Sequence, residues 1–450
     1  MGSGQETNDK PVNQTKQNNM KSRTISFALL GAAMLLACEG AIAQSTKQQA
    51  LEPVTRTGGI YHSYEGAPEV SPTPTPKGYK PFYISHFGRH GSRWHTSDRY
   101  YKRSLSLLEQ AEADDMLTEK GKELLEKVRI LSADAKDRYG ALSPRGVREH
   151  RGIAERMYYS FPEVFSTRGG RDVYIECRST LYPRVILSMA AFNERLKELN
   201  PELRISRESA HRYELYLTPM EGTDSITPLT EEAIDRFTER TIHPQPFLAR
   251  ILKDPSYPDQ IGKDPVSFMK GIYMLASITQ DVDYLNLSLY DIFTEDELFD
   301  LWQVYNLRFY LQHGPSPEFG KAVLADMKPL LQNIVASADS AIVYGTPAAT
   351  LRFGHDVNIT PLGALIGLEG LDVQESDPNQ LYLSWSSFLV SPMAANLQII
   401  FYRKNKNNDD ILVKFLYNEH ERTLPIACDT APYYPWEEVR AYLLQQIAKY

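Results

Sequence analysis

Cysteine is scarce in this sequence, with three residues among 450. A small fold held together by several disulfide bonds is therefore excluded. Beyond the first 45 residues, no stretch reaches the roughly 20 consecutive apolar residues that a membrane-spanning helix needs. Basic residues do not outnumber acidic ones, because the formal net charge is −8. This balance argues against general binding to nucleic acids, although it is compatible with a local basic pocket.

The composition is that of a folded, soluble chain. Hydrophobic residues make up 42% of the sequence and charged residues 24%, which is typical of globular proteins. A chain of 450 residues suffices for two or three average domains, or for one large domain with an insertion. Either arrangement can bury a substantial core.

Residues 1–43 predict an N-terminal extension followed by a secretory signal peptide. A basic segment over residues 20–23 precedes an apolar segment over residues 25–37, and Ala41-Ile42-Ala43 has the small-x-small pattern of a cleavage site. The expected product is exported, to the periplasm or the medium, and has no transmembrane span. An alternative is a lipid-anchored protein, because Leu35-Leu36-Ala37-Cys38 resembles a lipoprotein cleavage site with Cys38 as the anchor.

Two cysteines remain after such cleavage, Cys177 and Cys428. They lie far apart in the sequence, and two interpretations stay open: one disulfide bond in an oxidising compartment, or two buried thiols. Residues 44–80 are expected to form an extended leader into the folded part, because prolines are frequent from residue 66 onward.

Strand-like and helix-like segments alternate at both ends of the remaining chain. Strands are expected at 81–87, 173–177, 349–353, 395–403 and 411–417, and helices after Thr118, after Ser143, at 183–199 and at 436–449. The middle of the chain contains helix-like segments with proline-bearing loops and little strand pattern. We predict an α/β domain of residues 81–200 and 341–450, with a mostly parallel sheet flanked by helices. A mostly helical cap domain over residues 201–340 is expected to be inserted into it.

The segment Arg89-His90-Gly91-Ser92-Arg93 directly follows the first expected strand. The carboxyl ends of strands are where α/β sheets form their sites, and two guanidinium groups attract a dianion such as phosphate. The glycines would let the backbone approach a ligand closely. We interpret this segment as an anion site with His90 as a potential nucleophile. On these residues alone, a charged surface loop remains the alternative.

Two further clusters also follow expected strands. In Cys177-Arg178-Ser179-Thr180, Arg178 is a guanidinium that could enter the same pocket or form a surface salt bridge. In His355-Asp356, the residue types allow three interpretations: metal ligands, a helix N-cap, or an acid–base group beside a phosphate. No other cluster with metal-ligand spacing accompanies this pair, so no metal site is predicted.

Together, these clusters resemble the motifs of the histidine acid phosphatases, the second branch of the histidine phosphatase superfamily. Residues 89–93 match the family's R-H-G-x-R motif, and His355-Asp356 matches its late H-D motif. Residues 173–180 look like the family's central strand, which ends in a pocket arginine, and residues 142–146 look like its helix-starting segment. Asn418-Glu419 is similar to a segment of the inositol polyphosphate phosphatases. The resemblance extends from around residue 80 to the end, but only the motifs match closely.

The resemblance implies an exported phosphomonoester hydrolase that needs no cofactor and acts on a small-molecule phosphomonoester, such as phytate or another inositol polyphosphate. It implies that His90 attacks phosphorus to give a phosphohistidine and that Asp356 is the general acid. The implied phosphate ligands are Arg89, Arg93, Arg178 and His355. Two alternatives remain: a phosphomutase or transferase of the same superfamily, and a non-catalytic binder of phosphorylated ligands.

The sequence departs from the family pattern just after the first motif. The family has a proline two residues after the second arginine, where this sequence has Trp94-His95. We therefore expect a different rim around the pocket, with His95 and His211 as candidate rim residues. The family's several disulfide bonds are also mostly missing, because only two cysteines follow the signal peptide.

Overall fold

The computed structural model describes residues 1–4, 46–66, 72–405 and 410–450. The predicted signal peptide, its cleavage site and Cys38 lie outside these residues. Residues 50–450 form one compact unit, which contains every element named below. None of the described helices is long and apolar enough to cross a lipid bilayer.

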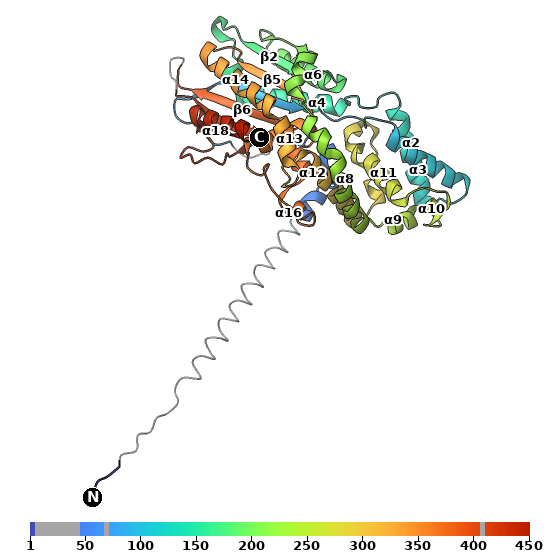
Figure 1. Cartoon of the computed structure of the whole chain (residues 1–450). Helices are drawn as coiled ribbons and strands as arrows, with labels where there is room; N and C mark the ends of the chain where they lie inside the picture. Colours follow the sequence, from blue (N-terminus) through green and yellow to red (C-terminus); the bar gives the residue numbers. More distant parts are fainter. Residues whose placement is uncertain (5–45, 67–71, 406–409) are drawn as a thin grey trace. The chain divides into compact units, whose positions relative to one another are not determined.

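A mixed β-sheet lies at the centre of this unit (Figure 1). Its strand order is β3-β2-β5-β1-β6-β7-β8, with β4 paired to β2 and β9 to β7. The strands are β1 (Lys80–Arg89), β2 (Tyr174–Ser179), β3 (Arg204–Ile205), β4 (Glu208–Ser209), β5 (Ala349–Gly354), β6 (Asn396–Arg403), β7 (Leu412–Tyr417), β8 (His420–Arg422) and β9 (Tyr434–Pro435). β1 to β5 pair in parallel, whereas β6 to β9 add antiparallel neighbours on one side. The parallel half therefore aligns the carboxyl ends of β2, β5 and β1.

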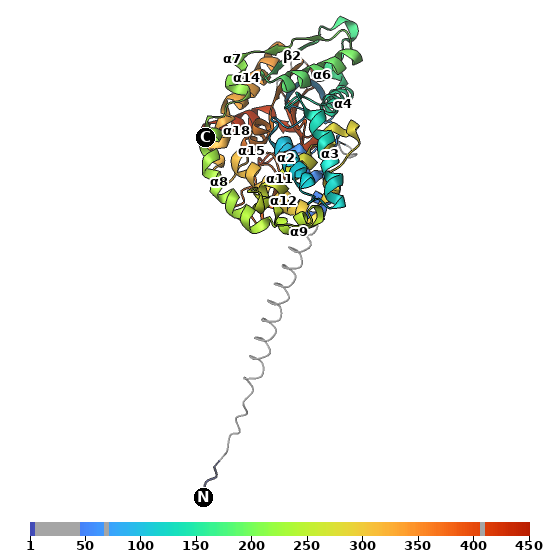
Figure 2. The same ribbon diagram turned by 90° about the vertical axis from the view of Figure 1, so that its right-hand side faces the viewer.

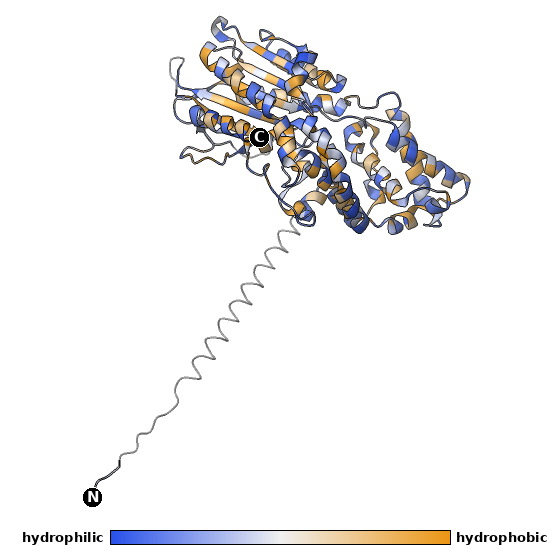
Figure 3. Ribbon diagram, viewed as in Figure 1, coloured by the Kyte–Doolittle hydropathy of each residue, from blue (hydrophilic) through white to orange (hydrophobic). Residues whose placement is uncertain are grey.

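The central strands are buried on both faces. Every residue of β5 is buried, as expected for a strand between two parallel neighbours in a sheet covered by helices. Along β1, Ile84 and His86 point to one side while Tyr83 and Phe87 join the core on the other. This alternation follows from the period of two in a strand. Figure 3 shows the same pattern, because the sheet ribbons are largely orange while the surrounding helices mix orange and blue.

Helices cover both faces of the sheet. On one face α4 (Pro144–Ser160), α5 (Pro162–Phe165) and α6 (Pro183–Leu199) form a core with β1, β2 and β5. On the other face α14 (Lys328–Tyr344), α15 (Asp356–Ile366) and α18 (Trp436–Lys449) pack against the strands and one another. The predicted α/β class, with a central sheet flanked by helices, is confirmed.

Most of the other helices form a helical region beside the sheet, whereas the helix of residues 211–217 packs against α14, β2 and β5. Figures 1 and 2 show α2, α3, α9 and α11 side by side there, with α8 next to α12. The helices are η1 (Val54–Tyr61), α2 (Arg99–Ala113), α3 (Glu119–Ala135), η2 (Arg168–Gly170), α7 (His211–Leu217), α8 (Glu221–Thr241), α9 (Pro244–Ile251), α10 (Tyr257–Gln260), α11 (Pro265–Ser277), η3 (Thr279–Leu285), η4 (Tyr290–Ile292), α12 (Glu295–His313), α13 (Gly320–Asp326), α16 (Leu381–Ser384) and α17 (Ser387–Val390). Residues 201–340 are thus mainly helical, and α2 and α3 pack with them although they precede residue 200.

Local sequence signals determine where α3, α4 and α6 begin. The Thr118 hydroxyl accepts a hydrogen bond from the backbone N–H of Gly121 at the start of α3. Ser143 does the same for Gly146 at the start of α4, with Pro144 in the first turn. Serine or threonine at the N-cap with proline at the first helical position is the expected pattern. α6 also begins at a proline, Pro183.

Candidate active site

Three segments meet at the carboxyl ends of the parallel strands. β1 ends at Arg89, opposite Gly354 at the end of β5, and the backbone N–H of His90 donates to the carbonyl of Gly354 at 3.0 Å. Thr180 follows β2, and its hydroxyl lies 3.2 Å from Nε2 of His355. The rings of His90 and His355 are 5.6 Å apart. The three predicted clusters therefore meet at one edge of the sheet, the second of them through Thr180.

A tight turn over residues 90–93, called the nucleophile turn below, carries the first motif. A Cβ atom added to Gly91 would lie 2.6 Å from Cα of Gly146, and one added to Gly146 would lie 2.5 Å from the Ser92 carbonyl oxygen. Only glycine fits such backbone contact. The Ser92 carbonyl also accepts hydrogen bonds from the N–H and hydroxyl of Ser143. The start of α4 therefore fixes the position of the nucleophile turn.

His90 is buried and held in one tautomer. Its Nδ1 lies 3.0 Å from the carbonyl oxygen of Gly91. Because a carbonyl oxygen can only accept, Nδ1 carries the proton and Nε2 keeps its lone pair. Burial holds the pKa of His90 well below its usual value, and the charges of Arg89 and Arg93 lower it further. A neutral imidazole with a free Nε2 is the form that can attack phosphorus.

Three arginines surround this imidazole. Arg89 is fully buried, and its guanidinium donates to the carbonyls of Ile60 and Ser391 and to Oδ2 of Asp356 at 2.8 Å. Arg93 is also buried, and its guanidinium lies over the ring of Tyr61. The third is Arg184, near the start of α6, whose charge lowers the pKa of His90 and of His355. Burial and the nearby charge of Arg93 in turn lower the pKa of Arg184 to about 10.

Arg178, the arginine expected in the pocket from the second cluster, lies elsewhere. Its guanidinium pairs with the carboxylate of Glu176, donates to the hydroxyl of Tyr216 at 3.2 Å and lies over the ring of Tyr213. It is within β2, in register with Arg352 of β5, one position before that strand ends. The structure therefore groups Arg184, not Arg178, with the two histidines.

Asp356 opens α15 and faces Arg89. Its Oδ2 accepts from Arg89, and Oδ1 lies 3.1 Å from the backbone N–H of Val357. Burial alone would raise the pKa of this carboxyl, but Arg89 and Arg93 outweigh burial and hold the pKa below its usual range. The preceding residue, His355, is the N-cap of α15, and burial lowers its pKa to about 3. Before substrate binds, the site thus contains a carboxylate and neutral imidazoles.

Comparisons with known proteins agree with this geometry. Residues 260–418 match the family model of the histidine phosphatase superfamily, branch 2. A multiple inositol polyphosphate phosphatase from Bifidobacterium longum, solved with inositol hexasulfate, superposes with a TM-score of 0.69 at 18% identity, covering 86% of this chain and 97% of that one. The phytase of D. castellii gives a TM-score of 0.63 at 16% identity and coverage of 87% and 85%. The Hafnia alvei phytase gives 0.53 at 13% identity and coverage of 83% and 98%. The sequence matches no curated protein.

The resemblance to the histidine phosphatases of branch 2 is confirmed. The prediction of a histidine-type phosphomonoesterase is confirmed with it. At these identities the solved structures show a shared fold, and the family match covers the late motif, His355-Asp356, but not the first motif.

The site opens into two adjoining cavities. The inner one, of about 280 Å³, reaches Asp356 and is lined on the helical side by Tyr61 and by His313 at the end of α12. The outer one, of about 770 Å³, lies between α2, α11 and α12. Tyr100, Tyr305 and Arg308 line both cavities. The two cavities therefore adjoin at these three side chains.

The two histidines expected at the rim lie differently. His95 is buried, its Nε2 donates to the carbonyl of Met274 at 2.6 Å, and burial lowers its pKa to about 3. Its neighbour Trp94 is buried as well and donates to Asp134 of α3. His95 therefore anchors the helical region rather than facing the cavities. His211 is exposed at the start of α7 and lines neither of the two cavities.

Neither remaining cysteine forms a disulfide bond. Cys177 is buried in β2 and its thiol donates to Oδ1 of Asn193, and Cys428 is half-buried. Of the two open interpretations, free thiols apply to this structure. Among the described residues, no group of three or more His, Cys, Asp and Glu side chains is arranged to hold a metal ion.

Proposed function

We propose that this protein is an exported phosphomonoesterase that works through a phosphohistidine at His90 and prefers small substrates with several phosphate groups. The observation that carries the proposal is a set of unpaired donors around a neutral imidazole. Nε of each of Arg89, Arg93 and Arg184 is buried and has no acceptor among the described residues. Buried donors need partners, and a phosphoryl group would supply them with three oxygens.

The proposed reaction has two displacement steps. In the first, Nε2 of His90 attacks phosphorus, the bond from phosphorus to the leaving oxygen breaks, and Asp356 gives its proton to that oxygen. In the second, water attacks phosphorus, the nitrogen–phosphorus bond breaks, and the proton of the water returns to Asp356. The arginines and His355 would stabilise the charge on the equatorial oxygens in both steps. No atom or proton is left over after one turnover.

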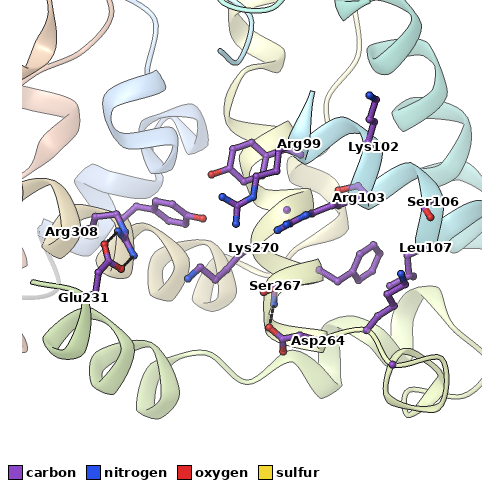
Figure 4. A pocket seen from close by; sticks show the side chains of 17 residues that line it. Arg99, Lys102, Arg103, Ser106, Leu107, Glu231, Asp264, Ser267, Lys270 and Arg308 are labelled. Carbon is purple, nitrogen blue, oxygen red and sulfur yellow. Dashed lines mark hydrogen bonds and ion pairs between the residues drawn. The ribbon is translucent and has the colours of Figure 1, made fainter. Parts of the chain in front are cut away.

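The outer cavity supports a substrate with more than one phosphate. Six basic and two acidic side chains line it, although the whole chain has a net charge of −8. Arg99, Arg103 and Lys270 form no salt bridge among the described residues, and Figure 4 shows them approaching the same space from α2 and α11. Burial and the charge of Arg308 lower the pKa of Lys270. An anion bound there would relieve this repulsion, as the outer phosphates of phytate or another inositol polyphosphate would.

Trapping the intermediate tests the proposal. The protein is mixed with a labelled phosphomonoester, quenched in base and assayed for acid-labile, base-stable label. Label is expected on the wild type and on His211→Ala, a control that removes an exposed histidine, and should be absent from His90→Ala. Label on the His90 variant would refute the assignment of the nucleophile.

Two other outcomes would support other functions. Stoichiometric binding without release of inorganic phosphate would indicate a binder, and transfer of phosphate to an added alcohol or sugar in preference to water would indicate a mutase or transferase. Export is tested separately, by locating the protein made with and without residues 20–43.

A further inference from the structure

A pair of buried carboxyl groups lies beneath the nucleophile turn and takes no part in the proposed reaction. One belongs to Glu149 of α4, the other to Asp281 of η3, and both residues are buried. They belong to different regions of the fold, since α4 packs on the sheet and η3 lies in the helical region. Two ionised carboxylates so placed would repel each other strongly in a medium of low dielectric constant.

Glu149 has the surroundings of a carboxylate. Oε2 accepts from the backbone N–H of Ser92 at 2.8 Å, and Oε1 accepts from the Ser92 hydroxyl at 2.8 Å and the backbone N–H of Tyr64 at 2.9 Å. Arg145 lies 3.9 Å away on the exposed side. Burial raises the pKa of Glu149, but the three donors on its two oxygens and the charge of Arg145 oppose this shift and favour the ionised form. Ser92 is the residue between Gly91 and Arg93, so Glu149 holds the nucleophile turn by both its backbone and its side chain.

Asp281 has the surroundings of a neutral acid. Its Oδ1 lies 2.9 Å from the hydroxyl of Ser63, while its Oδ2 is buried and has no partner among the described residues. An unpartnered carboxylate oxygen in the interior is costly, whereas the carbonyl oxygen of a neutral acid costs less. Burial raises the pKa of Asp281 well above its usual value, and the charge of Glu149 raises it further.

The serine hydroxyls connect the two carboxyl groups. The hydroxyl of Ser63 lies 3.2 Å from that of Ser92. Each hydroxyl has one proton to give, and Ser92 gives its own to Glu149. If Asp281 carries a proton, it donates to Ser63, Ser63 donates to Ser92, and every proton in the chain has an acceptor. If Asp281 is ionised, only the two serine protons remain for the three oxygen–oxygen contacts, so one contact is left without a hydrogen bond.

We propose that Glu149 and Asp281 hold one proton between them, carried by Asp281, and that the resulting hydrogen-bond chain positions the nucleophile turn. These are positioning residues, because they act through Ser92 and not on the substrate. The proposal rests on the proposed phosphatase reaction. It assigns the alkaline limb of kcat/KM to ionisation of Asp281, which breaks the chain and adds negative charge close to the phosphate ligand Arg93. The proton that Asp356 takes up when substrate binds acts on kcat.

Other charged and titratable groups act on this pair. The charged and titratable groups on the elements that face Asp281 are Glu149 and Arg145 of α4, Arg89 and Arg93 at the end of β1, Tyr101 of α2 and Tyr290 of η4. The two tyrosines have raised pKa values because they are buried, and the arginines stay charged, so Asp281 is the group in this set expected to ionise first above neutral pH.

The test uses substitutions that keep the shape of the side chain. Asp281→Asn cannot ionise, and its amide donates to Ser63 as the neutral acid does. Its alkaline limb of kcat/KM should therefore move to higher pH, so that one pH unit above the wild-type midpoint it is about tenfold more active relative to its own maximum. The matched control, Asp291→Asn in η4, removes an exposed carboxylate that pairs with Lys120 and Lys127 and should leave the limb in place.

A second variant tests the other end of the chain. Glu149→Gln has one acceptor oxygen for three donors, so it should lower kcat/KM by about tenfold or more. Because the charge of Glu149 would no longer raise the pKa of Asp281, the alkaline limb of this variant should also move to lower pH. If the limb of Asp281→Asn coincides with that of the wild type, the proposal is overturned. It is also overturned if Glu149→Gln keeps wild-type activity.

A measurement without turnover separates this proposal from the proposed function. Infrared difference spectra between the wild type and Asp281→Asn should show the C=O band of one protonated carboxyl at neutral pH, lost in the variant. Binding of inorganic phosphate, followed by calorimetry from about pH 5 to 9, should weaken at alkaline pH in the wild type and less in the variant. These results would stand even if no phosphohistidine formed, and absence of the band would refute the pair even in an active phosphatase.

Discussion

Replacing Arg184 by methionine tests which arginine completes the phosphate site. Arg184 lies near His90 and His355. The Nε atoms of Arg184 and Arg178 both lack an acceptor among the described residues, but only Arg178 is held through its other guanidinium nitrogens. A hydrogen bond between charged groups contributes about 1.5–3 kcal/mol, and each 1.36 kcal/mol corresponds to a factor of ten. Loss of one such bond to the transition state should therefore lower kcat/KM by about 10- to 150-fold. Arg178→Met is the matched control, because the Arg178 guanidinium is engaged by Glu176 and Tyr216.

The assay measures kcat and KM on a simple aryl phosphate at fixed salt, together with the increase in melting temperature that inorganic phosphate produces. The increase should shrink in Arg184→Met, because a ligand stabilises a protein in proportion to the logarithm of its occupancy. Without phosphate, the variant should be at least as stable as the wild type, since burial and Arg93 disfavour the charge of Arg184 in the empty site. A greater loss of activity in Arg178→Met than in Arg184→Met would refute this placement.

Three further predictions concern the acid, the outer cavity and stability. Asp356→Asn should lower kcat by about 10²- to 10⁴-fold on alkyl phosphates, whose leaving oxygen needs a proton, and far less on aryl phosphates; equal losses on both would exclude a general acid. Lys270→Met should weaken turnover of phytate but not of a simple monoester, with Lys122→Met, which removes an exposed amine paired with Glu119 of α3, as the control; equal effects of the two would argue against an anion site. His86 has a pKa lowered to about 3 by burial, so its contribution to stability is complete above about pH 6.5 and is lost as pH falls. In thermal melts, His86→Phe should therefore lose less stability than the wild type between pH 7 and pH 4. The same dependence of melting temperature on pH in both proteins would contradict this.

The sequence motifs predicted best those parts of the site whose positions depend on the ends of strands. The segment 89–93 and His355-Asp356 each follow a strand, and neighbouring parallel strands end at the same edge. Periodicity and capping residues likewise predicted α3, α4 and α6 with their starts. These features depend on residues close together in the sequence, which is why they could be predicted.

Arg184 could not be predicted in the same way. Arg178 and Arg184 flank one strand end, and the choice depends on which side chain finds partners nearby. Arg178 is within the strand and faces Glu176 two residues away, as the strand period of two requires. Arg184 follows the strand and begins a helix at Pro183, a position from which side chains reach the strand ends. A proline-started helix after a strand was the available signal.

The rim was mispredicted for a different reason. His95 follows the motif closely enough to suggest a pocket residue, but the chain turns toward the helical region at Trp94, whose ring meets Asp134 and Arg138 of another segment. Contacts of this kind join residues far apart in the sequence, and no local pattern marks them. The outer cavity could not be predicted for the same reason, because basic side chains from α2, α11 and α12 line it together.

The charges of the site explain why a phosphatase of this kind would favour acid. In this structure, the guanidinium of Arg89 donates a hydrogen bond to Asp356, and its charge keeps that carboxyl ionised. A carboxylate cannot donate a proton, so the free protein is not yet competent for the first step. A bound phosphate dianion competes for the same guanidinium and places negative charge beside Asp356, and both effects raise the pKa of the carboxyl. In the proposed reaction, substrate binding therefore prepares Asp356 to act as the general acid, and low pH assists by supplying the proton that this carboxyl takes up when the dianion binds.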